Sequence, residues 1–497
     1  MITTPMKNLI ISSRKSFLAK IQTDIAVKQI NEKFDGIIEK SYSNSVGDLD
    51  RSSQAWEKHG FGIFTNQLSK KLISHNADII VHSFKDLPVK NSRKTSFVCL
   101  KRDDPRDVIL IKLSSLKKKN LIIATSSPRR KYYLRLLKNY LPYKSLKSAA
   151  IRGNIQTRLK KILDSDNHDG VFMAKAAIDR VFKYGEKVDK KEFKKFKLYF
   201  NKFEKIILPL SEFPSAAAQG CIALEYRKND LKTENVLKKI NHLSSLEDCL
   251  IERKYLSKWG GGCALDIGVT VENILDRKIL FAKGKDTQTN KYFHEKKYLS
   301  KINSKKTKSI FPSDISKYQM FKRDLKDFSK NLNNKNLLLT RGEYKKISSL
   351  KGASNIVTSG VSTWKKMSKS GILINSSLDG FGENYRMIQS YYKSKKTPIY
   401  KLTYEGNVFK SNYSIISHYS LVPSINEFTI DNLFSAKSFY WMSFSAFKLA
   451  IKLRPDILNH RNSCGPGQTY QQISRFVSKE NLNVYLNYED FKKYELK

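Results

Sequence analysis

The sequence contains no long apolar run. Nowhere in its 497 residues do about 18 apolar residues follow one another, so we expect no transmembrane helix. The first residues, MITTPMKNLIISSRKS, include no apolar region of signal-peptide length, and a strand-like run begins by Leu9. These features predict a soluble, untargeted, cytoplasmic protein that does not bind a membrane.

Cysteine is scarce as well. The chain has five cysteines, at Cys99, Cys221, Cys249, Cys263 and Cys464. They form no CxxC pair and no cluster with histidine, so neither a metal site nor a disulfide framework is expected. Reduced thiols in the cytoplasm fit this pattern best.

Acidic residues are few relative to basic ones. The chain has 92 Lys+Arg against 46 Asp+Glu, a formal net charge of +46, and it is 40% hydrophobic, as a folded protein is. Such an excess can indicate nucleic acid, an anionic membrane or acidic small molecules. Lysine runs such as KVDKKEFKKFK favour a compositional bias on solvated surfaces together with an anionic ligand, and nucleic acid is the less favoured alternative.

Several segments repeat one plan, in which a short apolar run is followed by polar residues and then by a helical pattern. Ile79–Val81 leads to HSFKD, Leu121–Ala124 leads to TSSP, and Val171–Ala174 leads to another helix start. Strands that alternate with helices indicate an open α/β sheet, whose ligands lie beyond the carboxyl ends of the strands. At about 150 residues per domain, the length predicts three or four domains.

Four arginines stand near these strand ends, at Arg129, Arg130, Arg152 and Arg158. Helix N-termini at the same edge present free N–H groups and the positive ends of helix dipoles. A guanidinium can bind a carboxylate with two parallel hydrogen bonds. The sequence therefore predicts a site for a ligand with several carboxylates.

Asp86 is unexpected in such a pocket, because it would repel the carboxylates of a substrate. It could bind an N–H-bearing or cationic part of the substrate and transfer protons. The alternative is a structural salt bridge to Lys85 or to a nearby arginine.

The stretch GGGCALDIG places Cys263 directly after three glycines. Glycine lets the backbone approach another group closely or adopt positive φ, so a thiol there could carry a bulky group. The alternative is a buried cysteine beside a tight turn.

Taken together, these segments resemble the hydroxymethylbilane synthase family, also called porphobilinogen deaminase. The resemblance covers residues from about 8 to 285, in the order of the family. It rests on the stretches SSRKSFLAKIQ, GFGIFTNQL, ADIIVHSFKDLP, RDDPRD, ATSSPRRK, IRGNIQTRL, AAAQGCIALEYR and GGGCALDIG.

The resemblance implies a transferase of tetrapyrrole (porphyrin, heme) biosynthesis. It would condense four porphobilinogen molecules head to tail, release ammonia at each step and free the linear tetrapyrrole by hydrolysis. Cys263 matches the cysteine that carries a dipyrromethane cofactor through a thioether. Asp86 matches the catalytic aspartate, which would hydrogen-bond pyrrole N–H groups, stabilise the cationic intermediate and move the proton released in coupling.

Other side chains match positions that bind acetate and propionate groups. The family implies contacts to the cofactor from Lys85, Ser126, Ser127, Arg129, Arg130 and Arg152. It implies contacts to porphobilinogen and the polypyrrole intermediates from Arg14, Ser16, Thr125, Arg158 and Gln219. The chain departs from the family at Phe61, where a basic residue is usual, and at Asp266, where proline is usual. Both departures concern the grip on the cofactor rather than Cys263 or Asp86.

The implied fold is α/β, with two domains similar to periplasmic binding proteins and a small α+β domain. Domain 1 would comprise residues 1–107 and 215–238, domain 2 residues 108–214, and domain 3 residues 239–310, which carry the cofactor cysteine. We expect a monomer that binds no nucleic acid.

Residues 330–497 exceed what this enzyme needs and form a further α/β region. NLLLTRGE, GVSTWKKMSKSGILINSSLDGFGE, SFYWMSFSAFKLAIKL and SCGPGQTYQQIS read as strands and helices of α/β type. The region resembles uroporphyrinogen-III synthase, whose two α/β domains close on the same linear tetrapyrrole, and a fused second activity is expected. The alternatives are an accessory domain without activity and, for the whole chain, a non-catalytic protein that binds organic anions.

Overall fold

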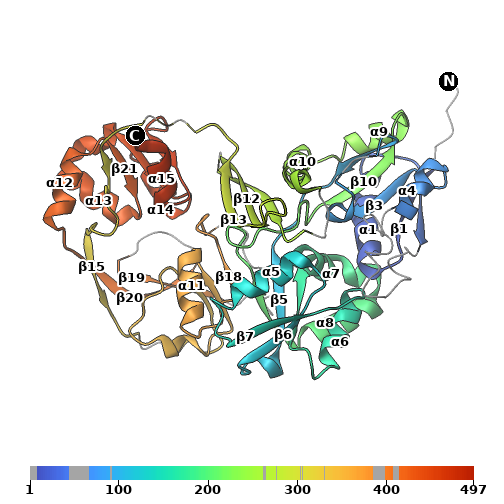
Figure 1. Cartoon of the computed structure of the whole chain (residues 1–497), viewed down its shortest axis with the longest axis horizontal. Helices are drawn as coiled ribbons and strands as arrows, with labels where there is room; N and C mark the ends of the chain where they lie inside the picture. The colour runs from blue at the N-terminus through green and yellow to red at the C-terminus, as the bar shows by residue number, and fades with distance from the viewer. Residues whose placement is uncertain are drawn as a thin grey trace. The chain divides into compact units, whose positions relative to one another are not determined.

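The computed structural model describes residues 8–43, 66–89, 92–260, 265–275, 277–302, 304, 306–328, 331–383, 398–406 and 413–497. The chain divides into two compact units. The first comprises Met1–Glu272 and Ile279–Lys297, and the second comprises Asn273–Lys278 and Tyr298–Lys497. Figure 1 labels their helices and strands.

The first unit contains two five-stranded sheets. One has the order β2-β1-β3-β10-β4, with β1 parallel to β2 and β3, and with β10 antiparallel to both of its neighbours. Its strands are β1 (Leu9–Arg14), β2 (Ile38–Ser43), β3 (Ile79–Ser83), β4 (Thr95–Cys99) and β10 (Ile222–Arg227). The helices α1 (Phe17–Asn31), α4 (Asn66–Ile73) and α9 (Leu231–Lys238) accompany it.

The second sheet repeats this plan with the order β7-β6-β8-β5-β9, in which β5 runs antiparallel to β8 and β9. Its strands are β5 (Asp107–Lys112), β6 (Asn120–Ala124), β7 (Ser145–Ala149), β8 (Gly170–Ala174) and β9 (Phe203–Ile207). Its helices are α5 (Pro128–Leu137), α6 (Ile155–Leu163), α7 (Lys175–Val188) and α8 (Lys190–Phe200). The open α/β sheet predicted from the sequence is confirmed, and the antiparallel strands make each sheet mixed.

A smaller three-stranded sheet follows, in the order β11-β12-β13. It consists of β11 (Gly268–Ile274), β12 (Arg277–Lys285) and β13 (Tyr292–Tyr298), after the helix α10 (Leu243–Leu256) and the short helix η3 (Ser257–Trp259). Gly268 permits a close approach here, because a Cβ on it would lie 2.2 Å from the carbonyl oxygen of Pro214.

The second unit also contains two sheets. The six-stranded sheet comprises β15 (Phe321–Leu325), β20 (Ser414–Pro423), β19 (Ile399–Tyr404), β16 (Asn336–Leu339), β17 (Asn355–Thr358) and β18 (Ser376–Ser377), in that order, with α11 (Val361–Lys369). The four-stranded parallel sheet comprises β14 (Ile310–Phe311), β21 (Ser438–Trp441), β22 (Arg461–Cys464) and β23 (Leu482–Val484). The helices α12 (Glu427–Ser435), α13 (Phe444–Leu453), α14 (Gln468–Ile473) and α15 (Tyr488–Glu495) belong to this half.

The second unit begins earlier than residue 330, where we expected the C-terminal region to start. Ile310 and Phe311 pair with Ser438 and Phe439, so the end of the expected domain 3 is a strand of the C-terminal sheet. β15 likewise pairs with β20. The polar residues that follow β15 resemble a linker in sequence, but they lie between two strands of one sheet.

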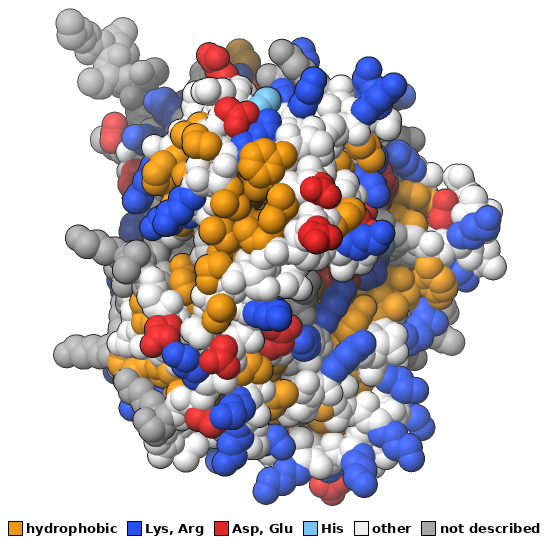
Figure 2. Space-filling model, turned by 90° about the vertical axis from the view of Figure 1, so that its left-hand side faces the viewer, with side chains coloured by type: hydrophobic (Ala, Val, Ile, Leu, Met, Phe, Trp, Pro, Cys, Tyr) orange, Lys and Arg blue, Asp and Glu red, His pale blue; other side chains and the backbone are white. Residues whose placement is uncertain are grey.

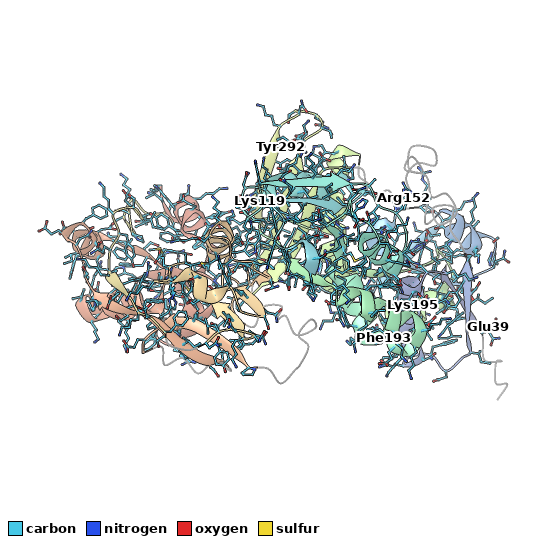
Figure 3. All side chains as sticks on the ribbon, turned by 90° about the horizontal axis from the view of Figure 1, so that it is seen from below. Glu39, Lys119, Arg152, Phe193, Lys195 and Tyr292 are labelled. Atoms are coloured by element: carbon cyan, nitrogen blue, oxygen red, sulfur yellow. The ribbon has the colours of Figure 1, made fainter. Side chains whose placement is uncertain are left out.

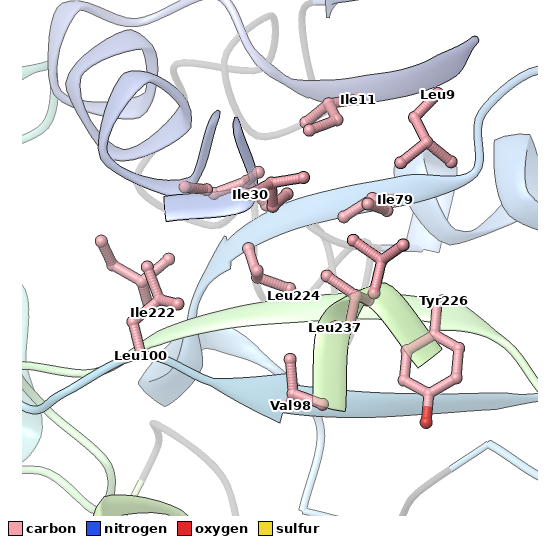
Figure 4. Packing of buried hydrophobic residues seen from close by; sticks show 13 residues of the cluster. Leu9, Ile11, Ile30, Ile79, Val98, Leu100, Ile222, Leu224, Tyr226 and Leu237 are labelled. Carbon is pink, nitrogen blue, oxygen red and sulfur yellow. The ribbon is translucent and has the colours of Figure 1, made fainter. Parts of the chain in front are cut away.

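The cores of the sheets consist of branched aliphatic residues, which favour extended backbone and pack well on a pleated surface. In the first sheet, Leu9, Ile11, Ile79 and Leu224 are each at most 1% exposed (Figure 4). In the second, all six residues of β5 are buried. Each sheet thus provides a rigid base for the loops at its strand ends.

The excess of lysine is spread over the surface. On the face shown in Figure 2, Lys and Arg side chains are scattered, with Asp and Glu among them. The helix α8 buries Phe193 and exposes Lys195, both labelled in Figure 3. Among the helices of the described ranges, none is long and apolar enough to cross a bilayer.

Candidate active site

The turn after β3 carries Lys85 and Asp86. It is a short helix, η1 (Phe84–Asp86). Phe84 is fully buried, and its ring meets the ring of Phe97 edge to face, with 4.8 Å between the ring centres. The Phe84 amide donates to the carbonyl oxygen of Cys221 at 3.0 Å. Phe84 thus anchors the start of this turn, while the side chains of Lys85 and Asp86 are half-buried.

Lys85 is joined to the second sheet through one glutamine. Its Nζ donates to Oε1 of Gln219 at 3.3 Å. The Nε2 of Gln219 donates to the carbonyl oxygen of Pro105 at 2.6 Å and to Oδ1 of Asp107 at 3.1 Å. Gln219 is 1% exposed, so it acts as a buried bridge between Lys85 and Asp107.

Asp107 pairs with two arginines of the site. Its Oδ2 lies 2.6 Å from Nη1 of Arg129, and its Oδ1 lies 2.7 Å from Nη2 of Arg130. Burial alone would raise the pKa of Asp107, but the two guanidinium groups hold it well below its ordinary value. The carboxylate therefore stays ionised and fixes both arginines at the start of α5.

Both arginines have further partners. Arg129 also donates to the carbonyl oxygen of Pro214 at 3.1 Å, and its guanidinium lies 5.3 Å from the centre of the Tyr133 ring. Arg130 donates to the carbonyl oxygen of Phe172 at 3.4 Å. Arg129 is 4% exposed and Arg130 8%, so both are more deeply buried than the sequence indicates.

The predicted helix starts are confirmed. Ser127 is the N-cap of α5 and Pro128 its first residue, and the side chain of Asn154 caps α6 by accepting from the Thr157 amide at 2.8 Å. Ser126 donates to the carbonyl oxygen of Ile151 at 2.8 Å, and the Ile151 amide donates back at 3.1 Å. This exchange ties the start of α5 to the chain that carries Arg152.

Thr125 and Ser16 also have local partners. The hydroxyl of Thr125 accepts from the Ser127 amide at 3.2 Å, and Thr125 is buried. Ser16 is the N-cap of α1 and accepts from the Ala19 amide at 3.3 Å. Both hydroxyls lie just before helices, beyond the ends of strands.

Arg158 lies in a cluster of like charges. Burial, then Arg130 and Arg14, and to a smaller extent Arg152, together lower the pKa of Arg158 to about 10. Asp86 is the acidic group that opposes this effect. Arg152 precedes α6 and is labelled in Figure 3. The structure thus brings Arg14, Arg130, Arg152 and Asp86 within electrostatic reach of Arg158.

A cluster with this much positive charge favours a ligand with several carboxylates. The guanidinium of Arg158 has a depressed pKa because it is partly shielded from water and its cationic neighbours repel it, and an added anion would relieve that repulsion. The donor set of arginines, a lysine, hydroxyls and helix N-termini matches acetate and propionate groups. The residues present therefore fit an acidic dipyrrole.

Cys263 and Phe61 lie outside the described residues. The chain is described up to Gly260, which has a φ of 76°, a left-handed conformation that favours glycine. Asp266 is half-buried, and its charge, after burial and Tyr292, contributes to raising the pKa of Tyr132. The other four cysteines are buried free thiols, which confirms them as packing residues.

Three important residues were not identified from the sequence. Asp107 lies in the RDDPRD stretch, but its pairing with two arginines has no local signal. Glu252 is fully buried and accepts from Arg102 at 2.6 Å, and Arg253 next to it contacts the turn of Asp86. A charged pair within an otherwise ordinary helix does not reveal that it is buried.

Comparison with known proteins identifies relatives of the first unit. A family model described as porphobilinogen deaminase, dipyromethane cofactor binding domain, matches residues 9–235. A probable porphobilinogen deaminase of Picrophilus torridus is 36% identical over 266 residues, which cover 52% of this chain and 83% of that protein. The porphobilinogen deaminase of Caldicellulosiruptor saccharolyticus is 33% identical and covers 56% of this chain and 89% of its own length.

One solved structure illustrates the range of structural neighbours. The periplasmic aliphatic sulphonate binding protein SsuA of Escherichia coli overlays with a TM-score of 0.28 at 12% identity, covering 51% of this chain and 70% of that one. A TM-score this low does not bear on the fold.

Proposed function

Because the chain belongs to the porphobilinogen deaminase family, we propose that its first unit is a hydroxymethylbilane synthase. It condenses four porphobilinogen molecules into the linear tetrapyrrole and releases one ammonia per molecule. The observation that carries this proposal is that Arg14, Arg130, Arg152 and the carboxylate of Asp86 all lie within electrostatic reach of Arg158. Such a cluster fits a substrate that is acidic at its side chains and becomes cationic at its reacting centre.

The proposed cofactor is a dipyrromethane attached through the sulfur of Cys263. The name of the matching family domain supports the group, and the donor set at the strand ends supports its binding here. Its carboxylates would be held by Lys85, Ser126, Ser127, Arg129, Arg130 and Arg152. When bound, the group supplies the pyrrole end to which the first porphobilinogen is joined.

Porphobilinogen and the growing chain would be bound by the remaining predicted residues, which are Arg14, Ser16, Thr125, Arg158 and Gln219. Arg158 is the strongest candidate among them, because its charge is not matched by a carboxylate at hydrogen-bond distance in the described structure. Its Nε donates to the carbonyl oxygen of Gly153 at 2.7 Å, which aims the guanidinium from the start of α6. Gln219 would act mainly by holding Lys85.

Asp86 would perform the chemistry. Its carboxylate oxygens can accept hydrogen bonds from pyrrole N–H groups. When the amino group of porphobilinogen leaves as ammonia, the same carboxylate stabilises the positive charge that develops on the ring. Stabilisation of that charge lowers the barrier by roughly several kcal/mol. Asp86 then takes the proton that coupling releases.

The test is to feed porphobilinogen to the purified protein and follow its consumption and the release of ammonia. Acidic p-dimethylaminobenzaldehyde is added separately to the protein without substrate, to detect a bound dipyrrole. The proposal expects both substrate turnover and the dipyrrole colour. Binding of porphobilinogen without turnover or colour would instead identify a non-catalytic protein that binds organic anions.

The domain layout follows the same proposal. We assign domain 1 to residues 1–107 with the return segment 215–238, and domain 2 to residues 108–214. In support, β10 of the return segment joins the sheet of β1 and β3, while β5 to β9 form a separate sheet. Domain 3 would consist of α10 and the sheet β11-β12-β13, and would carry the loop of Cys263.

For the second unit we propose a uroporphyrinogen-III synthase activity. Its support is architectural, since the unit has two α/β halves built on separate sheets, as the resemblance implies. In the stretch NLLLTRGE, the residues Asn336–Leu339 form β16, and Thr340 and Arg341 follow it. In the stretch SCGPGQTYQQIS, the glycines directly precede α14. The match to the porphobilinogen deaminase family model ends at residue 235, before this unit begins.

Lys401 connects the two halves within this unit. Lys401 of β19 is 1% exposed, and its Nζ lies 2.6 Å from Glu383 and 3.1 Å from Oε1 of Gln468 at the start of α14. Gly382 and Gly467 lie close together, since a Cβ on Gly467 would be in van der Waals contact with Gly382 at 3.5 Å.

This second activity is tested by isomer analysis of the oxidised products by chromatography. The intact chain fed porphobilinogen should give mainly the type III ring. A chain ending at Lys301 should release the linear tetrapyrrole, which closes spontaneously to the type I isomer. Type I from both proteins would leave the second unit as an accessory domain of a monofunctional synthase.

A further inference from the structure

The side chain of Arg253 connects α10 to the turn of Asp86, and Cys249 of the same helix lies in one apolar cluster with Phe84 and Leu87. Nη1 of Arg253 donates to the carbonyl oxygen of Leu87 at 3.0 Å, and its Nη2 donates to the carbonyl oxygen of Pro88. The guanidinium carbon lies 4.9 Å from the centre of the Phe84 ring. Arg253 is 4% exposed, so these contacts are shielded from water.

The three residues that Arg253 contacts flank Lys85 and Asp86 in the sequence. Phe84 precedes Lys85 and Asp86, and Leu87 and Pro88 follow them. The planar, permanently charged guanidinium can donate to two adjacent carbonyl oxygens and stack on an aromatic face at the same time. A lysine ammonium offers the charge without this geometry.

The helix that carries Arg253 also leads to the cofactor loop. α10 and η3 end at Trp259, and Gly260 then opens the stretch that contains Cys263. The preceding residue, Glu252, accepts hydrogen bonds from Arg102 and from the Ala218 amide at 2.6 Å each. The helix therefore has a fixed place relative to the turn of Asp86.

We propose that Arg253 is a positioning residue of the deaminase reaction. It fixes the backbone of the Asp86 turn relative to α10, and it does not itself contact the reacting atoms. The inference rests on the proposed hydroxymethylbilane synthase activity of the first unit. A misplacement of the carboxylate by about 1 Å would cost about 100-fold in rate, which sets the size of the expected effect.

The test compares Arg253→Met and Arg253→Lys with Lys254→Met, a change at the exposed neighbouring residue of the same helix. All variants are first checked for a folded thermal transition and, by intact mass, for a bound dipyrrole. In the Met variant we expect kcat to fall by about 10- to 100-fold with KM within about threefold of wild type. The Lys254→Met control should match wild type, and if the Met variant does not fold, the Lys variant decides by the same criteria.

Two further measurements separate positioning from a structural role. Arg253→Met combined with Asp86→Asn should lose little more rate than Asp86→Asn alone, because both changes disable one carboxylate. Guanidinium ion at millimolar concentration should partly restore kcat of Arg253→Ala. If the wild type is active and a folded, cofactor-bearing Arg253 variant has an unchanged kcat, the proposal is overturned. It is also overturned if the losses in the double variant are additive, or if guanidinium ion does not restore kcat. Inactive wild type would instead refute the proposed function.

Discussion

Asp86 stands on the turn after β3 and interacts electrostatically with Arg158, and this determines what a change at this residue should do. Asp86→Asn keeps the size of the side chain but removes its charge and its ability to accept a proton. We expect a folded protein that has lost at least tenfold in porphobilinogen consumption, equal to about 1.4 kcal/mol of barrier. Steady-state kinetics measure this.

The matched control is Asp166→Asn, at an exposed carboxylate of the same unit. It should behave as wild type. If Asp86→Asn stays within tenfold of wild type, Asp86 is a structural ion-pair partner of the arginines and not the catalytic group.

His418 gives a second prediction at the residue scale. It is 1% exposed, and neither ring nitrogen has a hydrogen-bond partner among the described residues. It stacks on Tyr344 at 4.3 Å and meets Tyr419 edge-on at 4.8 Å. Burial lowers the pKa of His418 to about 4, and Glu343 only partly opposes this.

The unfolded chain, with a histidine pKa of about 6.5, binds more protons than the folded chain, so the second unit loses stability as pH falls from about 6.5 toward 4. His418→Phe keeps the aromatic stack and removes the titration. Between pH 7 and pH 5 the wild type should lose on the order of 1–2 kcal/mol more unfolding free energy than the variant. Urea unfolding at both pH values measures this, and parallel losses in both proteins would contradict it.

At the scale of elements, α10 depends on one buried carboxylate. Glu252 accepts from Arg102, from the Ala218 amide and from the Val271 amide, the last at 2.6 Å. Burial alone would lower the pKa of Arg102, but Glu252 raises it above its ordinary value. The ion pair thus links α10 and β11 to the segment after β4 and to the segment before β10.

Glu252→Gln leaves Arg102 as a buried cation without a counter-charge. We expect a loss of about 3 kcal/mol or more in the unfolding free energy of the first unit. Glu247→Gln, at an exposed residue of the same helix, is the control and should change stability by less than about 0.5 kcal/mol. A loss at Glu252 no larger than at Glu247 would mean that the pair does not hold α10 in place.

Local signals predicted the elements well. The strands that deliver Asp86 and Thr125, the Ser127 and Asn154 caps and the proline start of α5 depend on neighbours in sequence, and the structure has them all. Partners far apart in sequence could not be predicted this way. The Asp107 carboxylate joins Gln219 to two arginines, and Arg253 reaches a turn some 165 residues away.

At the scale of the whole molecule, the sequence misplaced where the second unit begins. The polar stretch after Lys326 has the composition of a linker, but short strands such as β14 and β15 are set by distant partners, β21 and β20. A two-residue strand carries no periodicity that the sequence could reveal. The general excess of lysine likewise identified no single surface.

Because the two units are compact separately, they should unfold separately. We expect two thermal transitions from the intact chain, and one from a chain ending at Lys301, which keeps the pairing of Leu299 with Lys278. The truncated protein should retain porphobilinogen consumption within about twofold. A chain ending at Lys326 would keep β14 and β15 without their partners and should aggregate more readily. Calorimetry and light scattering test this, and one shared transition would contradict independent units.

The most direct test of the central claim is the intact mass of the purified protein and of Cys263→Ser. Wild type should carry the additional mass of two linked pyrrole units, and Cys263→Ser should be folded, lack that mass and show no useful turnover. Cys221→Ser, at a buried thiol that packs near the Asp86 turn, should keep the additional mass. Wild type without the increment, an increment that persists in Cys263→Ser, or one that is lost in Cys221→Ser instead would contradict the assignment of this chain as a dipyrromethane-dependent synthase attached through Cys263.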